Sequence, residues 1–592
     1  MASPMRIMLE ENLSTTSFIQ DAKPPPGLVG SSNHLAPERP MELVDLRRIS
    51  VQTRVSVVPM ASTSIHDIQP TPKGKRGLTF WLVFASNLLV EMLSALDLTA
   101  VSTALPTIVQ RLNGNDFIWA GGAYTIASTA VLPLVGGLVS GFGRKYVLIV
   151  FVTFFAVGSV ICGAAQNMTM LIAGRAIQGI GSGGSLSVTE IIFADMVPLP
   201  ERGKFQGIAA AVWALACAIG PPIGGALAGS GAWRWLFYMN IPLCALATAA
   251  ILFCLPNIVP KGSARKKIAE MDWIGNAVIV TSTILVFLGL TWGGLRFPWI
   301  SAEVLITLIL GVIGITVFFV IEKVWLHGQT VPEFFFTNRT TLSGYLGTFF
   351  HGVVSLTAVY YLPIYLQASK EASALKSGIE MFGLSFTIPI FAIVAGVSVE
   401  IIHIYRPQNY VGWLFSIVGF VLLSLLNEKS SAATYIGFQI PLGVGLGILW
   451  ISTQFPILAP LPVSNSAYAL AFFVFVRNFA QSWGIVVGGA ILQNVLTEKL
   501  PKSLTDTLPK DQEYAYQLIP TIPSMLEPQK SEVRAAFADG TKLIWQVMIG
   551  LSVAGLLTCL LMREEEMKTE MDETWAVVDK AKKVSDDDEE HA

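Results

Sequence analysis

The sequence predicts an all-α protein that crosses a membrane many times, and three observations support this fold class. Apolar residues make up 53% of the 592 residues. Charged residues make up only 14%, whereas about a quarter of the residues in soluble globular chains are charged. Many uninterrupted apolar runs reach the roughly 18 residues that span a bilayer as a helix. The lipid bilayer is therefore an expected partner, and the net charge of −2 gives no reason to expect a nucleic acid.

Apolar runs bounded by polar residues, glycine or proline predict fourteen transmembrane helices. They are expected near residues 78–106, 117–140, 146–165, 169–192, 206–228, 235–256, 274–293, 302–325, 343–367, 379–402, 410–426, 433–461, 467–494 and 542–562.

The orientation follows from the short loops, because Lys and Arg are enriched in cytoplasmic loops. If the N-terminus is cytoplasmic, the first three exterior loops hold only Arg111 and Arg234. The first three interior loops then hold Arg144, Lys145, Arg202, Lys204, Lys261, Arg265, Lys266 and Lys267. An even number of spans places both termini in the cytoplasm.

The segments outside the spans differ in composition. Residues 1–76 mix proline, serine and both charge signs, which predicts a disordered cytoplasmic tail. Residues 495–541 form a long charged exterior loop, and residues 563–592 an acidic cytoplasmic tail. All five cysteines lie inside apolar runs, which favours packed helices over disulfides.

Two carboxylates lie inside the first run, in "LVEMLSALDLTAVSTALPT" (residues 89–107). Glu91 and Asp97 each cost about 2.5–3.5 kcal/mol at the centre of a membrane. Arg175 in the fourth run needs a partner in the bundle interior for the same reason. With a rise of about 1.5 Å per residue, Asp97 and Arg175 both lie in the outer half of the membrane. We expect them to pair, either as a proton-responsive couple or as a static structural ion pair.

Other polar groups inside the runs allow two interpretations each. Glu91 lies about 120° around its helix from Asp97, and Glu190 lies near the inner end of the fourth run. Both are candidates for a proton path, or carboxylates that simply reach polar solvent. Further candidates for the lining of a central cavity, or for hydrogen bonds between helices, are Gln178, Gln454, Arg477 and Gln481. We expect His351 to be a packing histidine rather than a titrating one.

Several motifs in a fixed order resemble one transporter family. They are "LDLTAVSTALPT" in the first run, "GGLVSGFGRKYVL" from Gly136, "LIAGRAIQGIGSGG" in the fourth run and "AIGPPIGGAL" in the fifth. Together they resemble the signatures of the major facilitator superfamily, and the fourteen-span count resembles its drug:proton antiporter branch. The run "GIGSGG" has the spacing of a dinucleotide fingerprint but no preceding strand. Small residues that allow close helix packing explain it better.

The resemblance implies a major facilitator fold with two six-helix halves, residues 77–256 and 343–562. Each half would consist of inverted three-helix repeats. Residues 257–342 would contribute a cytoplasmic loop, two additional helices and the loop that follows them. The implied function is proton-coupled antiport by alternating access, which exports a hydrophobic or amphipathic small molecule such as a drug or a secondary metabolite. The family pattern also has an acidic residue at Asp97 and an arginine at Arg175.

Two motifs of the family can be matched to this sequence residue by residue. The antiporter motif is represented by Gly220, Pro221, Gly224 and Gly225, with an ordinary packing kink as the alternative. The cytoplasmic loop motif retains Gly143, Arg144 and Lys145. It has Ser140 where most members have an acidic residue, so we expect the charge brace of the family to be weakened or replaced. Arg144 and Lys145 then remain as topology anchors.

Nothing in the sequence indicates catalysis: no metal cluster, nucleophile–base pair or phosphate-binding loop appears. We expect a transporter without cofactors, driven by an ion gradient and acting as a monomer, in the plasma membrane or the vacuolar membrane. An importer, for example of a siderophore–metal complex, is the first alternative, and the antiporter motif argues against it. A transporter-like sensor is the second, and the short N-terminal tail argues against that.

Overall fold

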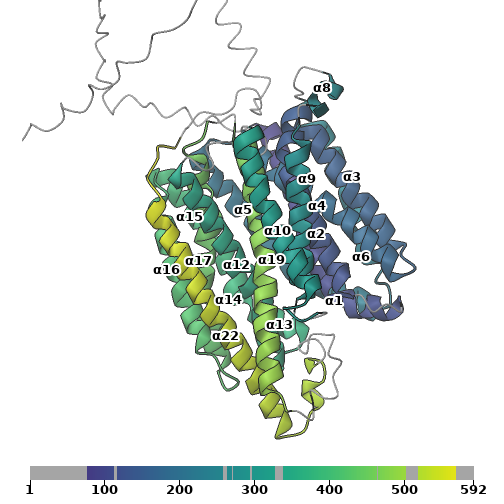
Figure 1. Cartoon of the computed structure of the whole chain (residues 1–592). Coiled ribbons are helices and arrows are strands. Elements are labelled where there is room, and N and C mark those ends of the chain that lie inside the picture. Colours follow the sequence, from purple (N-terminus) through teal and green to yellow (C-terminus); the bar gives the residue numbers. More distant parts are fainter. Residues whose placement is uncertain are drawn as a thin grey trace, which may run out of the picture. The chain divides into compact units, whose positions relative to one another are not determined.

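The computed structural model consists of long helices packed side by side (Figure 1). It describes residues 77–112, 117–257, 263–269, 271–293, 297–326, 338–462, 465–501, 504 and 518–567. These residues belong to one compact unit, Lys75–Ala592. The predicted N-terminal tail 1–76 lies outside the described residues, as does most of the acidic C-terminal tail.

The first group of helices forms the N-terminal half. It comprises α1 (Leu78–Arg111), α2 (Phe117–Phe142), α3 (Arg144–Gly163), α4 (Met168–Met196), α5 (Leu199–Gly229), α6 (Trp235–Tyr238) and α7 (Asn240–Cys254). Within it α4 packs along α2 and α3, and α1 packs along α5. The span predicted at 235–256 is thus two consecutive helices, α6 and α7.

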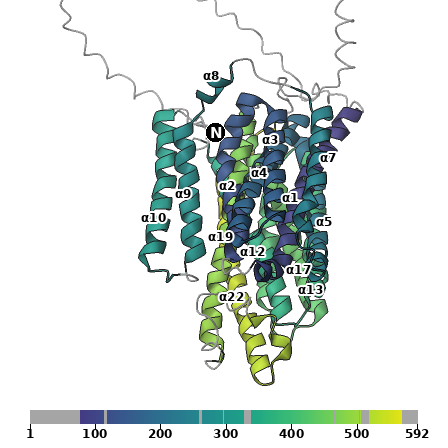
Figure 2. The ribbon, with the colours of Figure 1, turned by 90° about the vertical axis from the view of Figure 1, so that its right-hand side faces the viewer.

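A short helix and a separate pair follow. They are α8 (Ala264–Ala269), α9 (Trp273–Trp292) and α10 (Ala302–Ile321), which continues as a π-helical turn, η1 (Glu322–Leu326). The helices α9 and α10 pack on each other, and α9 contacts α2 and α19. Figure 2 shows this pair standing to one side of the other helices.

The last group forms the C-terminal half. It comprises α12 (Arg339–Ala368), α13 (Ala374–Glu380), α14 (Phe382–Ser385), α15 (Thr387–Ile402), α16 (Arg406–Ser424), α17 (Ala432–Ser452), α18 (Phe455–Leu458), α19 (Ser466–Lys499), η3 (Ile522–Ser524), α22 (Gln529–Thr558) and η4 (Cys559–Leu561). Both α19 and α22 extend into the segment 495–541 that we predicted to be an exterior loop.

Twelve helical stretches of the described residues are long and apolar enough to cross a membrane. Two predicted spans, α4 and α16, do not meet this criterion, so the count of fourteen stays a prediction. The reason for α4 is visible in its sequence: it contains Arg175, Glu190 and Asp195 among many glycines and serines. Its 29 residues nevertheless lie between α2 and α3. The polar content of α4 therefore belongs to the interior of the half.

The glycines of α4 let two neighbouring helices approach its backbone. A Cβ atom placed on Gly183 would lie 2.1 Å from the carbonyl oxygen of Ser128 in α2, and one on Gly181 would lie 2.3 Å from the amide nitrogen of Phe155 in α3. No side chain fits at such distances. The glycine run "GIGSGG" is thus a helix-packing surface, as expected from membrane helix interfaces.

The two ends of the bundle can be told apart by the turns of the chain. We call the end where α4 finishes and α5 begins (Met196–Leu199) the basal end, and the end where α3 finishes and α4 begins (Gly163–Met168) the apical end. At the basal end Gly143 joins α2 to α3 with a φ of 84°. This left-handed conformation favours glycine, which explains why the loop motif has glycine there.

The two halves are in close contact near the basal end. A Cβ on Gly207 of α5 would lie 2.7 Å from the Cα of Ile393 in α15. The backbones of Gly203 in α5 and Gly396 in α15 approach equally closely. On the other side of the interface, a Cβ on Gly136 of α2 would lie 3.2 Å from the Cα of Tyr468 in α19. We call these α5–α15 and α2–α19 approaches the basal contact.

The same two helix faces each have an unpacked position nearer the apical end. Gly225 lies about five helical turns from Gly207, and Gly122 about four turns from Gly136, so each pair shares a helix face. No heavy atom of the described residues lies within 4 Å of a Cβ built on Gly225 or Gly122. The described helices of the other half are therefore not packed on these two positions, although α13 of the C-terminal half still contacts α5.

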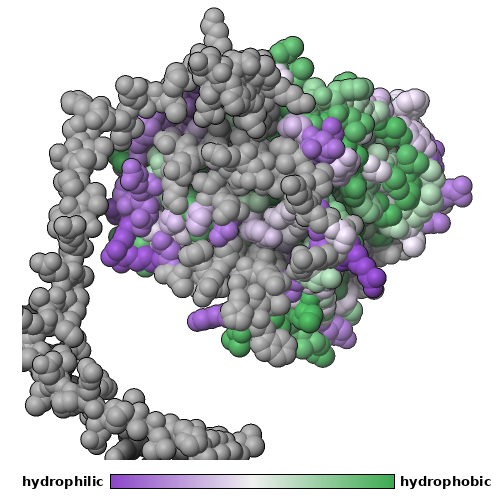
Figure 3. All heavy atoms as spheres, turned by 90° about the horizontal axis from the view of Figure 1, so that it is seen from above, coloured by the Kyte–Doolittle hydropathy of each residue, from purple (hydrophilic) through white to green (hydrophobic). Residues whose placement is uncertain are grey.

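The outer surface of the helices is apolar, as expected for a protein surrounded by lipid. Exposed side chains on α10 include Ile306, Ile309, Leu310, Val312 and Ile313. Figure 3, which looks onto the basal end, shows a broad hydrophobic area on its right-hand flank and smaller hydrophilic patches.

Candidate functional site

The centre of the N-terminal half contains a buried ion pair between α1 and α4. Nη1 of Arg175 lies 2.6 Å from Oδ2 of Asp97. The side chain of Asp97 is completely buried and that of Arg175 is 2% exposed. A pair this deep is not screened by solvent, and removing one partner would leave an uncompensated charge. The contact predicted from helix depth is therefore present in the structure.

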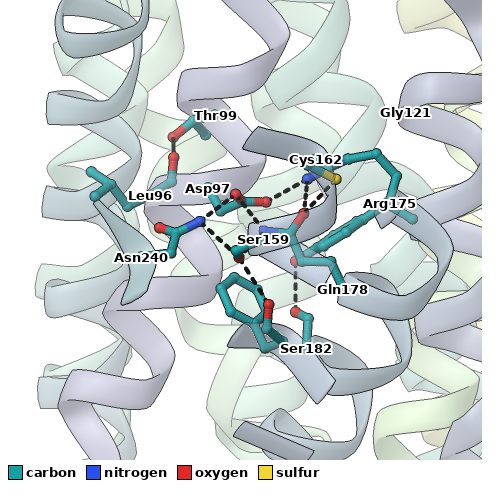
Figure 4. Close-up of polar contacts among 12 residues, drawn as sticks. Leu96, Asp97, Thr99, Gly121, Ser159, Cys162, Arg175, Gln178, Ser182 and Asn240 are labelled. Carbon is teal, nitrogen blue, oxygen red and sulfur yellow. Dashed lines mark hydrogen bonds and ion pairs between the residues drawn. The ribbon is translucent and has the colours of Figure 1, made fainter. Parts of the chain in front are cut away.

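Two amide side chains form hydrogen bonds with this pair, and a serine hydroxyl contacts one of the amides (Figure 4). Gln178 bridges it, because its Oε1 accepts from Arg175 at 2.8 Å and its Nε2 donates to Oδ1 of Asp97 at 2.8 Å. Nδ2 of Asn240, from the start of α7, donates to the same Oδ1 at 2.8 Å. The Oγ of Ser159 in α3 accepts from Gln178 at 2.9 Å. We call Asp97, Arg175, Gln178, Asn240 and Ser159 the Asp97 network.

An aromatic ring covers the arginine of this network. The guanidinium carbon of Arg175 lies 4.2 Å from the centroid of the Tyr124 ring, within the range of a cation–π interaction. The hydroxyl of Tyr124 donates to Ser182 at 2.6 Å, which fixes the ring between α2 and α4. The arginine is thus bound by a carboxylate, an amide and an aromatic face.

Protonation of Asp97 would change the contacts of the Asp97 network. Both oxygens of the Asp97 carboxylate accept hydrogen bonds from donors on α4 and α7. A proton on this carboxylate would occupy one acceptor site and cancel the attraction to Arg175, which changes the contacts between α1 and α4. The network therefore couples the charge of one group to the packing of helices.

A second polar cluster lies nearer the basal end. Nε2 of Gln206 in α5 donates to Oε2 of Glu190 in α4 at 2.5 Å. Nε2 of Gln454, between α17 and α18, donates in turn to Oε1 of Gln206. Glu91 of α1 is within electrostatic range of Glu190 and forms a side-chain hydrogen bond with Thr189. We call Glu91, Glu190, Gln206 and Gln454 the basal carboxylate cluster.

Arg477 lies in the C-terminal half and is held differently from Arg175. Its guanidinium carbon lies 4.5 Å from the centroid of the Trp450 ring and 4.3 Å from that of Phe473. Its Nη2 donates to the backbone oxygen of Trp450 at 2.8 Å. Among the described residues it has no carboxylate within 4 Å, although the charge of Glu190 attracts it from across the interface.

The other two glutamines predicted to line a cavity differ in their burial. Gln178 is buried in the Asp97 network and does not line an opening. Gln481 is partly exposed. The buried ring of His351 packs against Trp450, and its Nε2 is 3.1 Å from the backbone oxygen of Leu446. This placement agrees with a packing histidine.

The loop motif contains an ion pair that the sequence did not suggest. Nε of Arg144 lies 2.8 Å from Oδ2 of Asp195 at the end of α4. Lys145 donates to the backbone oxygens of Leu252 and Leu255 at the end of α7. Arg144 and Lys145, which we predicted to be topology anchors, thus also connect α3 to other helices at the basal end.

The glycines of the antiporter motif face two different neighbours. A Cβ on Gly220 would lie 2.0 Å from the hydroxyl oxygen of Thr99 in α1, so this glycine packs inside the N-terminal half, about half a helical turn from Asp97 along α1. Gly224 is buried, and Gly225 is exposed with none of the other described helices against it. The helix α5 continues through Pro221 to Gly229.

The structure thus divides the predicted site residues into two groups. Asp97, Arg175 and Gln178 meet in one network, and Glu91, Glu190 and Gln454 meet in the other. Sequence reasoning missed Asn240, Ser159, Tyr124 and Gln206. Asn240 had the clearest signal, since it follows the apolar-aromatic stretch "WLFYM" and would otherwise be buried without a partner. Among the described residues no three His, Cys, Asp or Glu side chains gather to hold a metal ion.

A family model decides the assignment. The model of the Major Facilitator Superfamily matches residues 88–489. The chain belongs to this superfamily. It is accordingly a multi-pass membrane transporter of small molecules and not an enzyme.

Relatives that are similar over most of their length are fungal transporters. The efflux pump FUS6 of Gibberella fujikuroi is 34% identical over 515 residues, which cover 85% of this chain and 92% of that protein. The MFS-type efflux pump LUC4 of a Fusarium species is 35% identical over 515 residues, which cover 86% and 91%. The MFS efflux transporter aclA of Aspergillus oryzae is 32% identical over 521 residues, which cover 86% and 94%.

Solved structures agree with the major facilitator fold. The structure of the proton:xylose symporter XylE matches with a TM-score of 0.55 and 14% identity, and covers 84% of this chain and 99% of that one. At this identity the likeness concerns the fold alone.

Proposed function

We propose that the chain is a proton-coupled antiporter that exports a hydrophobic or amphipathic small molecule, such as a toxin or a secondary metabolite. The observation that carries this proposal is the Asp97 network, because burying an ionisable carboxylate in a membrane is costly and such residues often mark proton pathways. Three relatives named as efflux pumps or efflux transporters support the direction of transport.

The arrangement of the halves suggests where the proton enters. The excess of Lys and Arg in the basal loops favours a cytoplasmic basal end. The apical opening then faces the exterior, as it would in a plasma-membrane protein with both termini in the cytoplasm. A proton from outside reaches Asp97, weakens its attraction to Arg175 and favours the return of the empty transporter to a state open to the cytoplasm. The substrate enters there and leaves at the apical end. This cycle requires only a monomer of the protein.

Transport into inverted membrane vesicles tests this function. The protein is produced in yeast lacking its own major efflux pumps, and inverted vesicles are prepared from these cells. Nile red or ethidium is then added outside the vesicles. We expect acidification of the vesicle lumen to drive accumulation of at least one probe, and dissipation of the pH gradient by a protonophore to stop it.

A matched variant makes the test specific to the site. Asp97→Asn keeps the shape of the side chain but removes its charge, and we expect it to abolish the accumulation driven by the pH gradient. Lys499→Gln, far along α19, serves as the control with wild-type transport. Uptake of the probes into intact cells, driven by external acid, would instead show an importer.

A further inference from the structure

The basal carboxylate cluster joins the two halves through a directed chain of hydrogen bonds. Glu190 belongs to α4 and Gln206 to α5, both in the N-terminal half, whereas Gln454 follows α17 in the C-terminal half. The amide of Gln206 donates to Glu190, so its oxygen is left to accept from Gln454. An ionised carboxylate can only accept. The charge on Glu190 therefore determines which side of the Gln206 amide faces the other half.

Electrostatic attraction adds to this connection. The cation of Arg477 in α19 is the charge that acts most strongly on Glu190. Among the described residues no carboxylate lies closer to Arg477 than that of Glu190. The rings of Trp450 and Phe473 and the backbone oxygen of Trp450, which contact its guanidinium, carry no net charge to neutralise it. Ionised Glu190 thus attracts the C-terminal half both through Gln206 and directly.

The other charged groups around Glu190 come from several elements. Glu91 on α1 repels it, and Arg202 at the start of α5 attracts it. Arg202 also donates to the backbone oxygens of Ala194 and Val197. On α3, Arg144 and Lys145 are engaged at the basal end, with Asp195 and with the end of α7. On α2 the titratable side chain is Tyr124, in the Asp97 network.

This cluster lies beside the basal contact. Gln206 directly precedes Gly207, whose backbone meets Ile393, and Gln454 directly precedes Phe455, whose ring faces the Cβ position of Gly203. Any opening of the basal end must separate these residues. Glu190 is only partly buried, so water can reach it once the halves move apart.

We propose that Glu190 is a second proton-binding residue, and that its ionised form holds the basal contact closed. This inference rests on the proposed antiport function and deepens it. When Glu190 takes up a proton that entered from the apical side, the attraction to Arg477 is lost and Gln206 is free to turn. The basal end then opens, and Glu190 releases the same proton to the cytoplasm. Glu91, about 9 Å along α1 from Asp97, is the residue placed to pass the proton on.

Distance measurements between spin labels test the proposal. Labels are attached to cysteines replacing Tyr146, at the basal end of α3, and Ile402, at the basal end of α15, which are both exposed. The five native cysteines are replaced first, and wild-type transport of Nile red or ethidium is verified in this background. In nanodiscs we expect the short distance to dominate at high pH and a longer one to gain population as the pH falls.

Three variants decide the outcome. Glu190→Gln, which imitates the protonated form, is expected to favour the long distance at every pH, so that the distance no longer responds to pH. Gln454→Met is expected to weaken the short-distance population while the pH response remains. Glu400→Gln removes a carboxylate from the same end of α15 and is the control with a wild-type response.

The failures of the two proposals can be told apart. If the wild type transports in response to the pH gradient but Glu190→Gln keeps the wild-type pH response of the distance, the inference about Glu190 is wrong and the antiport function stands. The inference is also wrong if Glu400→Gln changes the response as much as Glu190→Gln. If the pH gradient drives no transport in the wild type, the proposed antiport function itself is wrong.

Discussion

Arg175 and Arg477 lie inside the two halves of the bundle, 2% and 6% exposed, and their surroundings differ. Arg175 contacts the carboxylate of Asp97 at 2.6 Å and has further partners in Gln178 and Tyr124. Arg477 lies between the rings of Trp450 and Phe473 and donates to a backbone oxygen. One arginine is neutralised within its own half, whereas the other is stabilised without a carboxylate.

The difference between the two arginines indicates that the halves contribute different charged groups. The N-terminal half contains the carboxylates that we propose to bind protons, and its arginine is paired with one of them. The C-terminal half contributes a cation whose charge is still available to a carboxylate across the interface. A conformational change can therefore create or remove an attraction between the halves without breaking the ion pair of Arg175.

The largest effect should come from Arg175→Met. This change leaves the Asp97 carboxylate buried without its cation, which costs about 3–5 kcal/mol of folding stability in comparable buried pairs. Denaturant unfolding in mixed micelles measures the loss. The double variant Asp97→Asn, Arg175→Met should recover part of it, because no charge is then left alone. A double variant as unstable as the single one would contradict the description of Arg175 as a paired charge.

A smaller effect is expected from Arg477→Met. The variant loses cation–π contacts worth about 2 kcal/mol when desolvated, but no carboxylate in its own half is left unpaired. The same unfolding measurement applies, with Arg477→Lys as the variant that keeps the charge and loses the planar stacking. If Arg477→Met destabilises the protein as much as Arg175→Met, the contrast between the two arginines does not hold.

Tyr124→Phe should cost about 1 kcal/mol, the usual net worth of one hydrogen bond. The ring over Arg175 remains, and only the bond from the hydroxyl to Ser182 is lost. We expect a slightly lower unfolding midpoint and transport that stays driven by the pH gradient. Complete loss of that transport would show that the hydroxyl itself takes part in proton movement.

The smallest effect is expected from Lys499→Gln. Its ion pair with Asp539 is about half-exposed, and such pairs contribute about 0–1 kcal/mol. The variant sets the baseline for the two buried arginines in the same unfolding assay. The stabilising contribution should fall further at high salt, because solvent screens this pair.

The sequence was sufficient to predict most helices and one contact of the site. Apolar length located the spans, and the position of both Asp97 and Arg175 in the outer half of the membrane predicted their pairing. The ends of the helices were harder to predict from the sequence, because α22 begins with polar residues at Gln529, outside the apolar stretch. A helix that extends beyond the bilayer needs no apolar run there.

Sequence reasoning missed several site residues for a common physical reason. Asn240, Ser159 and Gln206 are neutral, so they carry no large membrane cost that would mark them in the sequence. The ion pair of Arg144 with Asp195 depends on where α4 ends relative to α3, which no local pattern specifies. The absence of an acidic residue at Ser140 drew attention to the wrong position, since the partner carboxylate comes from another helix.

The pair α9–α10 has a consequence for the biosynthesis of the protein. Within the described helices α10 contains the most apolar of the candidate spans, and only 17% of that stretch is buried by the rest of the protein. We expect it to leave the translocation channel as an independently stable span. The N-terminal half can then assemble its buried Asp97 network while the ribosome is still producing the C-terminal half.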